Sequence, residues 1–433
     1  MKKNTQITNL SIESAGLPKD PKLVIAEYIW NGFDAKATEV DIAIDSNELG
    51  YINSIIISDN GEGIVFDTLP YSFGNFLDSV KKTSIKRSSY TRGKKGKGRF
   101  SFSLFATRAI WNTIVREEGV LKTYRIQIDR DSKEQYDVSE SIPVENQRTG
   151  TQVRLEGVFG LNSSHLESQE FMDYMAQEFG WFLYLNRDLG YTIRINGAQL
   201  KYDHLIQETD LLSWTLYSPV GDSSYTFQVN YIRWNQQIGD RYYYYLRNSE
   251  KREVAKVLSS FNNNAIDFHH SVYVTSNFFD TFEQEDISVS TDVNLFTGKE
   301  KQVVYRNLLA ELRDFLDRKQ KKYVRENAVA VKLSELEKKG FLPHYDQTEK
   351  DRKRKEILLA LVQEIYIIDP RIFFGVKTDL IRTYLGFLDL LLQTEKSAEI
   401  LPILEQAIPL SDKERIRIKQ LLILPNNLDK GVI

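Results

Sequence analysis

The chain has 433 residues, 41% of them hydrophobic, and a formal net charge of −3, which are ordinary values for a globular protein of two or three domains. This charge gives no sign of a nucleic-acid or membrane partner, although local patches need separate judgement. The absence of cysteine excludes disulfides, thiolate catalysis and cysteine-bound metal centres. No apolar run approaches the ~20 residues needed to span a bilayer, and no secretory signal is evident, so we expect a cytoplasmic protein.

A helix is predicted to begin at Pro21, because proline at the first helical position loses no needed hydrogen bond. Glu27 and Asn31 are four residues apart, and Asp34 follows three residues later, so all three side chains share one face. Apolar residues surround this stripe. A carboxylate, an amide and a second carboxylate in a row suit a divalent cation and a polarised water better than they suit packing.

Two strands are predicted next, at residues 40–45 and 51–58, and the second ends in Asp59-Asn60-Gly61-Glu62-Gly63. Glycines at 61 and 63 make a tight turn with little side-chain bulk, against which a flat ring could rest. Asp59 could then accept a hydrogen bond from an exocyclic amine of that ring. A plain strand and turn is the alternative interpretation.

A basic run without any acid extends from Lys81 to Arg99 and precedes an apolar helix predicted to start at Phe100. Glycines before a helix expose backbone N–H groups to an anion, and the helix dipole adds to the attraction. A solvated basic loop or a nucleic-acid patch is the alternative. The glycines of the run and the two residues after them are Gly93, Gly96, Gly98, Arg99 and Phe100.

Further strands are predicted at 111–115, 124–128 and 151–155, the last introduced by Gly150 and Thr151. In this order the motifs resemble the GHKL ATPase superfamily, which includes type II topoisomerase ATPase domains, ninety-kilodalton heat-shock chaperones, sensor histidine kinases and mismatch-repair MutL proteins. The matching pieces are Glu27-x-x-x-Asn31-x-x-Asp34-Ala35, Asp59-Asn60-Gly61-Glu62-Gly63, the Gly93–Gly98 loop and Gly150-Thr151.

This resemblance implies a site for ATP and Mg²⁺ on the first helix. Asn31 would hold the magnesium ion, Glu27 would be the general base that orients the attacking water, and Asp34 would hold the end of the helix or support these groups from behind.

The same resemblance implies how the rest of the nucleotide is held. Asp59 would bind the adenine amine, with Gly61 in its turn, and Gly63 would let the chain pass close to the base. Thr151 would form a hydrogen bond near the adenine. The loop of Gly93, Gly96 and Gly98, continued by Arg99 and Phe100, would be the phosphate lid.

The expected fold class is α+β. We expect a GHKL (Bergerat) α/β sandwich with an N-terminal arm at residues 1–205, a transducer-like α/β domain at 206–322 and a small helical domain at 323–433. Six apolar residues in the last domain would line its core, or else a dimer or partner surface. They are Leu380, Ile381, Tyr384, Leu385, Leu388 and Leu391.

The chain departs from the superfamily at the lysine or arginine with which a transducer domain contacts the γ-phosphate. In MutL-like proteins it follows the strand that Ile287–Ser290 would match, but this chain continues with Thr291-Asp292-Val293-Asn294, which has no basic residue. The other candidates are Arg247, Lys251, Arg252, Lys299 and Lys301.

The leading functional hypothesis is an ATP-hydrolysing conformational switch. ATP would order the lid and promote a nucleotide-dependent homodimer, and the other domains would carry that motion to a protein partner, as in a chaperone-like protein. The alternatives are a DNA-transaction or phage-defence (antiviral) ATPase that touches nucleic acid, and a nucleotide-binding regulator that hydrolyses little.

Overall fold

The computed structural model describes residues 20–73, 98–218, 223–239, 241–259, 266–280 and 299–423, with Asn9, Ile12, Leu17 and Phe261 as isolated positions. The chain divides into two compact units. The first comprises Met1–Leu212, Gln228–Lys256 and His270–Ile287, and the second Ser213–Phe227, Val257–His269 and Ser288–Ile433. The three-domain division expected from the sequence stays a prediction.

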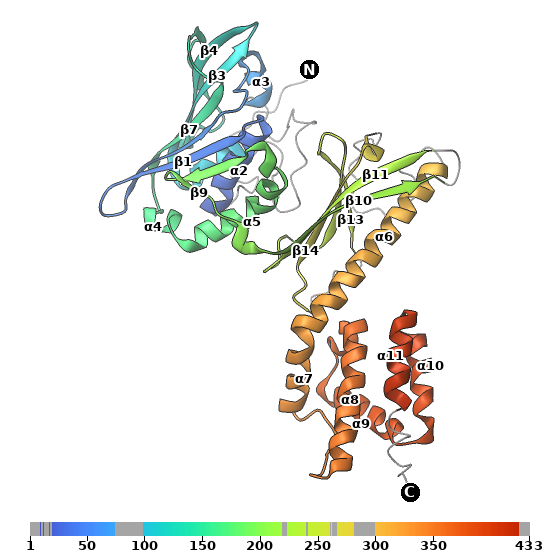
Figure 1. The fold of residues 1–433 in the computed structure, drawn as a ribbon. Coiled ribbons are helices and arrows are strands. Elements are labelled where there is room, and N and C mark those ends of the chain that lie inside the picture. The colour runs from blue at the N-terminus through green and yellow to red at the C-terminus, as the bar shows by residue number, and fades with distance from the viewer. Residues whose placement is uncertain are drawn as a thin grey trace, which may run out of the picture. The chain divides into compact units, whose positions relative to one another are not determined.

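The first unit is built on a nine-stranded sheet with the order β5-β4-β3-β7-β2-β1-β8-β9, in which β6 also pairs with β4 (Figure 1). Neighbouring strands are antiparallel except β1 and β8, which are parallel. The strands are β1 Glu39–Ser46, β2 Ile52–Asp59, β3 Ala106–Glu117, β4 Val120–Asp129, β5 Asp137–Val138, β6 Ile142–Pro143, β7 Gly150–Val158, β8 Thr192–Ile195 and β9 Ala198–Gln199.

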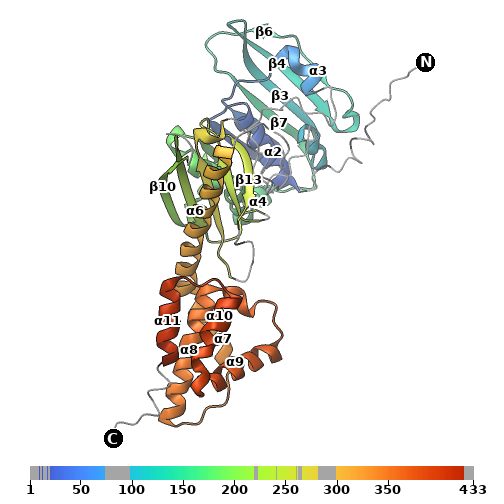
Figure 2. The same cartoon turned by 90° about the vertical axis from the view of Figure 1, so that its right-hand side faces the viewer.

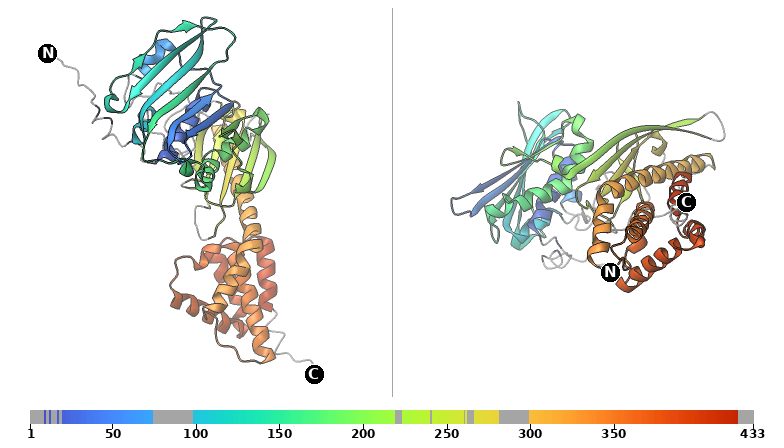
Figure 3. Two further views of the ribbon diagram at one scale, coloured as in Figure 1. Left: turned by 90° about the vertical axis from the view of Figure 1, so that its left-hand side faces the viewer. Right: turned by 60° about the horizontal axis from the view of Figure 1, so that its bottom comes forward.

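Helices α2 (Pro21–Asp34) and α5 (Gln169–Leu185) pack against each other beside this sheet, as the two views of Figure 3 show. Their contact is aromatic: the Trp30 ring centroid lies 4.9 Å from that of Phe179, and the Phe33 centroid lies 4.8 Å from that of Phe182. The short helices α3 (Leu69–Ser72) and α4 (Ser163–Leu166) complete the unit. The α/β sandwich expected from the sequence is confirmed.

The helix expected from Phe100 onward differs from the structure. A 3₁₀ segment, η2, covers only Gly98–Leu104, and β3 begins at Ala106. The physical reason is the alternating apolar pattern that follows, which pairs β3 with both β4 and β7 and leaves no length for an α-helix. Because no α-helix begins at Phe100, a helix dipole cannot contribute to anion binding there.

A second sheet has five strands in the order β10-β11-β14-β12-β13. They are β10 Ile206–Tyr217, β11 Ser224–Trp234, β12 Tyr243–Arg247, β13 Glu253–Leu258 and β14 His270–Thr275. Strand β12 is buried along its whole length and pairs in parallel with β14. Strand β10 mixes polar and apolar residues on both faces, so its sequence has no clear alternating pattern.

The C-terminal region is helical, as expected, and is shown in Figure 2. Helix α6 (Lys299–Tyr323) continues through a π-helical segment (Val324–Ala328) into α7 (Val329–Lys338). The remaining helices are α8 Glu349–Ile368, α9 Thr378–Leu392, α10 Ile400–Ala407 and α11 Asp412–Ile423. Within the described residues, no helix has both the length and the apolarity to cross a membrane.

The core of this helical region corrects one prediction. Ile381 and Leu385 are buried in it, and Leu388 and Leu391 pack partly against it. Leu380 and Tyr384, which were also expected there, are 45% and 46% exposed. They lie one residue out of phase with the buried stripe, which rotates them about 100° around the helix.

Candidate nucleotide site

Glu27, Asn31 and Asp34, the polar residues predicted on one face of a helix, all lie in α2. Eight residues of α2 are buried, whereas Glu27, Asn31 and Asp34 are each half-buried. Trp30, one turn before Asp34, joins the helix to α5, because its indole Nε1 donates a hydrogen bond to Oε1 of Glu178 at 2.6 Å. The helix is therefore held against α5 on the side next to its three half-buried polar residues.

Asp59 ends β2 and lies between α2 and β7. Its Oδ1 accepts hydrogen bonds from the backbone N–H of Gly61 at 2.8 Å and of Thr151 at 3.3 Å. On the other side α2 approaches closely, since a Cβ placed on Gly32 would lie 3.0 Å from the Cβ of Asp59. The first, second and fourth sequence motifs thus meet at one end of the sheet.

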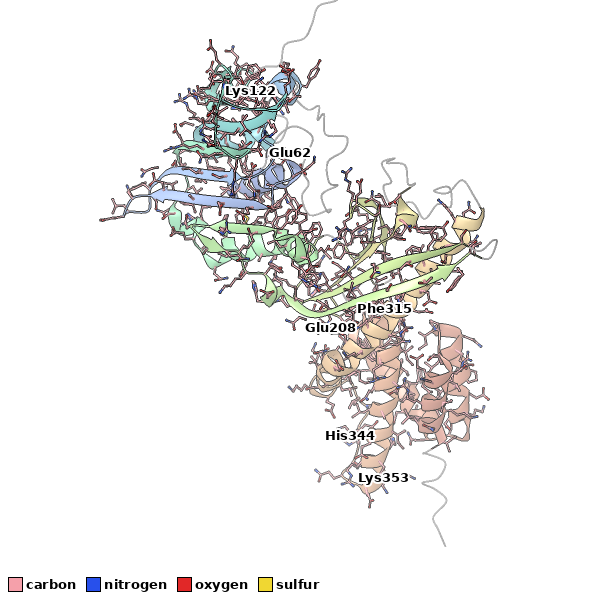
Figure 4. All side chains as sticks on the ribbon, turned by 45° about the horizontal axis from the view of Figure 1, so that its top comes forward. Glu62, Lys122, Glu208, Phe315, His344 and Lys353 are labelled. Carbon is pink, nitrogen blue, oxygen red and sulfur yellow. The ribbon has the colours of Figure 1, made fainter. Side chains whose placement is uncertain are left out.

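The turn after Asp59 requires glycine at one position in particular. Gly63 has φ of +80°, and a Cβ there would lie 2.3 Å from the carbonyl oxygen of Ile114. The turn is further held by Asn60, whose Oδ1 accepts hydrogen bonds from the backbone N–H groups of Thr38 and Glu39 at 2.8 and 3.0 Å. Glu62, labelled in Figure 4, forms an exposed ion pair with Lys36 at 2.6 Å.

Thr113 is a residue of this site that sequence reasoning missed. Its buried Oγ1 accepts a hydrogen bond from the Ile64 N–H at 2.9 Å and lies 3.1 Å from Oγ1 of Thr151. It therefore joins the turn after Asp59 to β7. The register of β3 against β7, which pairs Thr113 with Thr151, creates this contact, and a single threonine within a strand carries no signal of it.

The end of the glycine-rich loop reaches α2. Gly93 and Gly96 lie outside the described residues, but Gly98 is described, and a Cβ placed on it would lie 2.4 Å from Cγ and 2.6 Å from Oε1 of Glu27. The first and third motifs therefore touch at this point.

The two residues after Gly98 pack against their own domain. The Arg99 guanidinium lies 4.6 Å from the centre of the Phe100 ring, and burial lowers the pKa of Arg99 to about 10, so the side chain stays charged at neutral pH. The backbone oxygen of Arg99 lies 3.5 Å from the hydroxyl of Tyr28. Phe100 is buried, which gives it a packing role at the base of the loop.

The basic residues considered as partners of the γ-phosphate lie on different elements of the fold. Thr291–Asn294 fall outside the described residues, and Lys299 and Lys301 belong to α6 in the second unit. Lys251 is exposed, and Arg252 forms an ion pair with Glu250 at 3.1 Å.

Arg247 is the buried candidate. It ends β12, its Nε donates to the carbonyl oxygen of Lys251 at 2.8 Å, and burial lowers its pKa to about 10. It shares a strand face with Tyr245, which stacks on Tyr273 at 4.9 Å between ring centroids, and Tyr273 stacks on Trp181 of α5 at 5.7 Å. Arg247 therefore lies on the sheet face that packs against α5.

The residues present fit ATP and magnesium. Among the described residues no group of three or more His, Cys, Asp or Glu side chains that could hold a metal ion occurs. Mg²⁺ needs no such group, because it keeps several waters and takes substrate phosphate oxygens alongside one or two protein ligands. The Asn31 amide and the Glu27 carboxylate would supply the oxygen ligands, and the Asp59 carboxylate would accept a hydrogen bond from the base.

These features lie together in an α/β sandwich. Residues 20–154 match the family model described as histidine kinase-, DNA gyrase B- and HSP90-like ATPase. The match runs from the N-cap of α2 into β7 and therefore contains all four motifs. Over these residues the chain is similar to the GHKL ATPase superfamily.

Two solved structures are also similar to the chain. The Aquifex aeolicus MutL ATPase domain complexed with ADP is 14% identical, with 60% of this chain and 92% of that chain covered and a TM-score of 0.32. The N-terminal domain of a DNA repair protein is 15% identical, with coverage of 71% and 98% and a TM-score of 0.34. No curated protein matches the chain.

Proposed function

We propose that the protein binds ATP with Mg²⁺ and hydrolyses it. The observation that carries this proposal is the convergence of distant segments on α2: Gly98 abuts Glu27, and Asp59 abuts Gly32. Three polar side chains on one helix face suit many ligands, but their closeness to the Asp59 carboxylate and to Gly98 favours a nucleotide.

Each side chain has a distinct task in this proposal. Asp59 accepts a hydrogen bond from the adenine amine, while the backbone N–H groups of Gly61 and Thr151 hold its carboxylate in place. Asn31 ligates the magnesium ion, which when bound neutralises charge on the phosphate oxygens. Glu27, one turn before Asn31, orients the attacking water toward the γ-phosphate and accepts its proton.

Hydrolysis would drive a switch that acts on a partner. Gly98 touches Glu27, so a rearrangement of the glycine loop on ATP binding would reach the proposed base directly. We propose that this loop closes over ATP and that two chains pair in the ATP state. The resulting motion would be transmitted to a protein partner. The buried Arg247 is the residue of the second sheet that we propose to complete the phosphate end of the site, because it lies on the face that packs against α5.

The substitution Asp59→Asn tests the proposal. The asparagine Oδ1 can still accept from the Gly61 and Thr151 N–H groups, so the turn is retained, but an amide group that cannot accept a hydrogen bond replaces the second oxygen. We expect ATP affinity, measured by calorimetry, to fall by at least about tenfold. The matched control is Asp137→Asn, an exposed aspartate in β5, which should bind ATP as the parent does.

Glu27→Ala separates binding from hydrolysis. We expect this variant to bind ATP with little change and to lose turnover by about two to four orders of magnitude, the usual contribution of general-base catalysis. ATP turnover that survives Glu27→Ala would show that the base has been assigned wrongly. An Asp59→Asn variant that binds ATP as tightly as the parent would contradict the adenine role.

A further inference from the structure

We call residues 61–66, the segment just after the turn at Asp59, the strap. At its start, the backbone N–H of Gly61 donates a hydrogen bond to Oδ1 of Asp59 at 2.8 Å. Further along, Gly63 lies against the carbonyl oxygen of Ile114 in β3. The strap therefore connects the carboxylate proposed to bind the base with the hairpin of β3 and β4.

Ile64, in the middle of the strap, is held at both of its backbone polar groups. Its N–H donates a hydrogen bond to Oγ1 of Thr113 in β3 at 2.9 Å, and its carbonyl oxygen accepts one from the hydroxyl of Tyr124 in β4 at 2.7 Å. Tyr124 is buried, and burial raises the pKa of its hydroxyl, so the group keeps its proton and donates. The backbone at Ile64 therefore cannot shift without breaking a hydrogen bond to a buried side chain.

The far end of the strap is held by a carboxylate. The backbone N–H of Phe66 donates to Oε1 of Glu117, the last residue of β3, at 2.7 Å. The other carboxylate oxygen of Glu117 lies 3.3 Å from Nζ of Lys122, which is labelled in Figure 4. The Phe66 ring meets the Tyr124 ring edge to face, with 5.0 Å between the ring centroids. Because a hydrogen bond to a charged group is stronger than one between neutral groups, Glu117 holds this end of the strap firmly.

We propose that Tyr124 and Glu117 are positioning residues for the base of the nucleotide. They hold the strap, and the Gly61 N–H at the start of the strap orients the Asp59 carboxylate toward the adenine amine. This inference rests on the proposed ATP function. It extends that function to two residues of the β3–β4 hairpin, which act through the strap without touching the nucleotide.

A strap held in this way makes the base end of the site rigid before the nucleotide arrives. The nucleotide then does not have to order this segment when it binds, which favours affinity. The proposed general base Glu27 lies instead beside Gly98. Loosening the strap should therefore weaken recognition of the base and leave the rate of hydrolysis at saturating ATP nearly unchanged.

The test compares ATP with purine riboside triphosphate, which is ATP without the 6-amino group. Calorimetry on the full chain with Mg²⁺ gives the ratio of the two dissociation constants. We expect the parent to bind ATP at least about tenfold more tightly, because the amine donates to a carboxylate. Tyr124→Phe removes only the hydroxyl, and we expect the ratio to fall below about threefold while kcat stays within about twofold of the parent value. A general loosening of the fold would weaken the binding of both nucleotides equally and leave the ratio unchanged.

A second pair of variants tests Glu117. Glu117→Met is similar in length but has no oxygen to accept from the Phe66 N–H, and we expect it to narrow the ratio as Tyr124→Phe does. Glu117→Gln keeps an accepting oxygen and should keep the parent ratio. The control is Tyr345→Phe, which removes a hydroxyl that donates to Oδ1 of Asp389 at 3.0 Å in the helical region, and it should also keep the parent ratio.

Two results would overturn this inference alone. One is an equal loss of affinity for both nucleotides in Tyr124→Phe and Glu117→Met, which would give the two residues a purely structural role. The other is a parent-like ratio and parent-like affinities in both variants, which would show that they do not position the base. A parent chain that binds ATP and the analogue equally well would contradict the role of Asp59 itself, and one that binds neither would overturn the proposed function. In either of these cases the inference falls with the assignment on which it rests.

Discussion

The contact between Gly98 and Glu27 makes a quantitative prediction about Gly98→Ala. The new methyl group would lie 2.4 Å from Cγ and 2.6 Å from Oε1 of Glu27, whereas carbon atoms in ordinary contact are about 3.5–4.0 Å apart. Because the obstacle is a flexible side chain and not backbone, the fold can accept the methyl group by moving the Glu27 carboxylate. The displacement needed is on the order of 1 Å.

A displacement of this size at the proposed base should lower turnover more than binding. A 1 Å misplacement of a reacting group can cost about a hundredfold in rate. We therefore expect kcat for ATP hydrolysis to fall by about that factor, while the dissociation constant for ATP changes by less than about threefold. Steady-state kinetics and calorimetry on the same preparation measure the two quantities.

A double-mutant cycle shows whether Gly98→Ala acts through Glu27. In a Glu27→Ala background the new methyl group has no carboxylate to displace, so we expect Gly98→Ala to have no further effect on the residual rate. An equal loss in both backgrounds would refute the reasoning, because the alanine would then act on the loop itself. A parent-like kcat for Gly98→Ala alone would refute it as well.

Three further predictions concern the packing around the site and the helical region. Thr113→Val removes an acceptor from a buried backbone N–H and should lower the free energy of unfolding by about 1–3 kcal/mol, measured by denaturant titration, with weaker ATP binding. Trp30→Phe removes the donor to buried Glu178 and should cost about 1.5–3 kcal/mol in the same assay. Burial alone would raise the pKa of Glu414, but hydrogen bonds from Lys321 and Ser411 outweigh this effect and lower the pKa below its ordinary value of 4.5. The ionised carboxylate therefore stabilises the fold above pH 4.5. This contribution is lost as pH falls through the folded-state pKa. Thermal melts of Glu414→Gln should therefore differ from the parent at neutral pH and converge only as pH falls through the lowered folded-state pKa of Glu414.

Each of these three has an outcome that would contradict it. Thr113→Val with unchanged stability would mean that water or a shifted side chain replaces the hydroxyl. If Trp30→Phe left the free energy of unfolding unchanged, the hydrogen bond between α2 and α5 would not stabilise the fold. A difference between Glu414→Gln and the parent that stays constant from neutral to acid pH would show that the carboxylate contributes through packing and not through its charge.

The helix and the strand end that carry the proposed chemistry could be predicted from local sequence patterns. The polar stripe on α2 could be found because a helix repeats every 3.6 residues, and a run of apolar neighbours makes three polar side chains at that spacing conspicuous. Asp59 and its glycines could be found because a buried apolar strand ends there. These are local patterns, and the structure confirms the helix and the strand in which they lie.

The contacts of these elements could not be predicted from local patterns, because they depend on the fold. Strand pairing places Thr113 against Thr151, and the fold brings Gly98 onto Glu27 across 71 residues of chain, a separation that no local pattern encodes. The short 3₁₀ segment Gly98–Leu104 stands where a helix was predicted, because β3 already begins at Ala106 and pairs with β4 and β7 on its two sides.

The division of α9 into a buried and an exposed side likewise depends on contacts between residues far apart in the chain. Both sides are equally apolar in the sequence, and only the packing against α8 and its neighbours selects which one is covered within the chain. Hydrophobic periodicity identifies a face that avoids water, but which other surface covers that face depends on contacts between residues far apart in the chain.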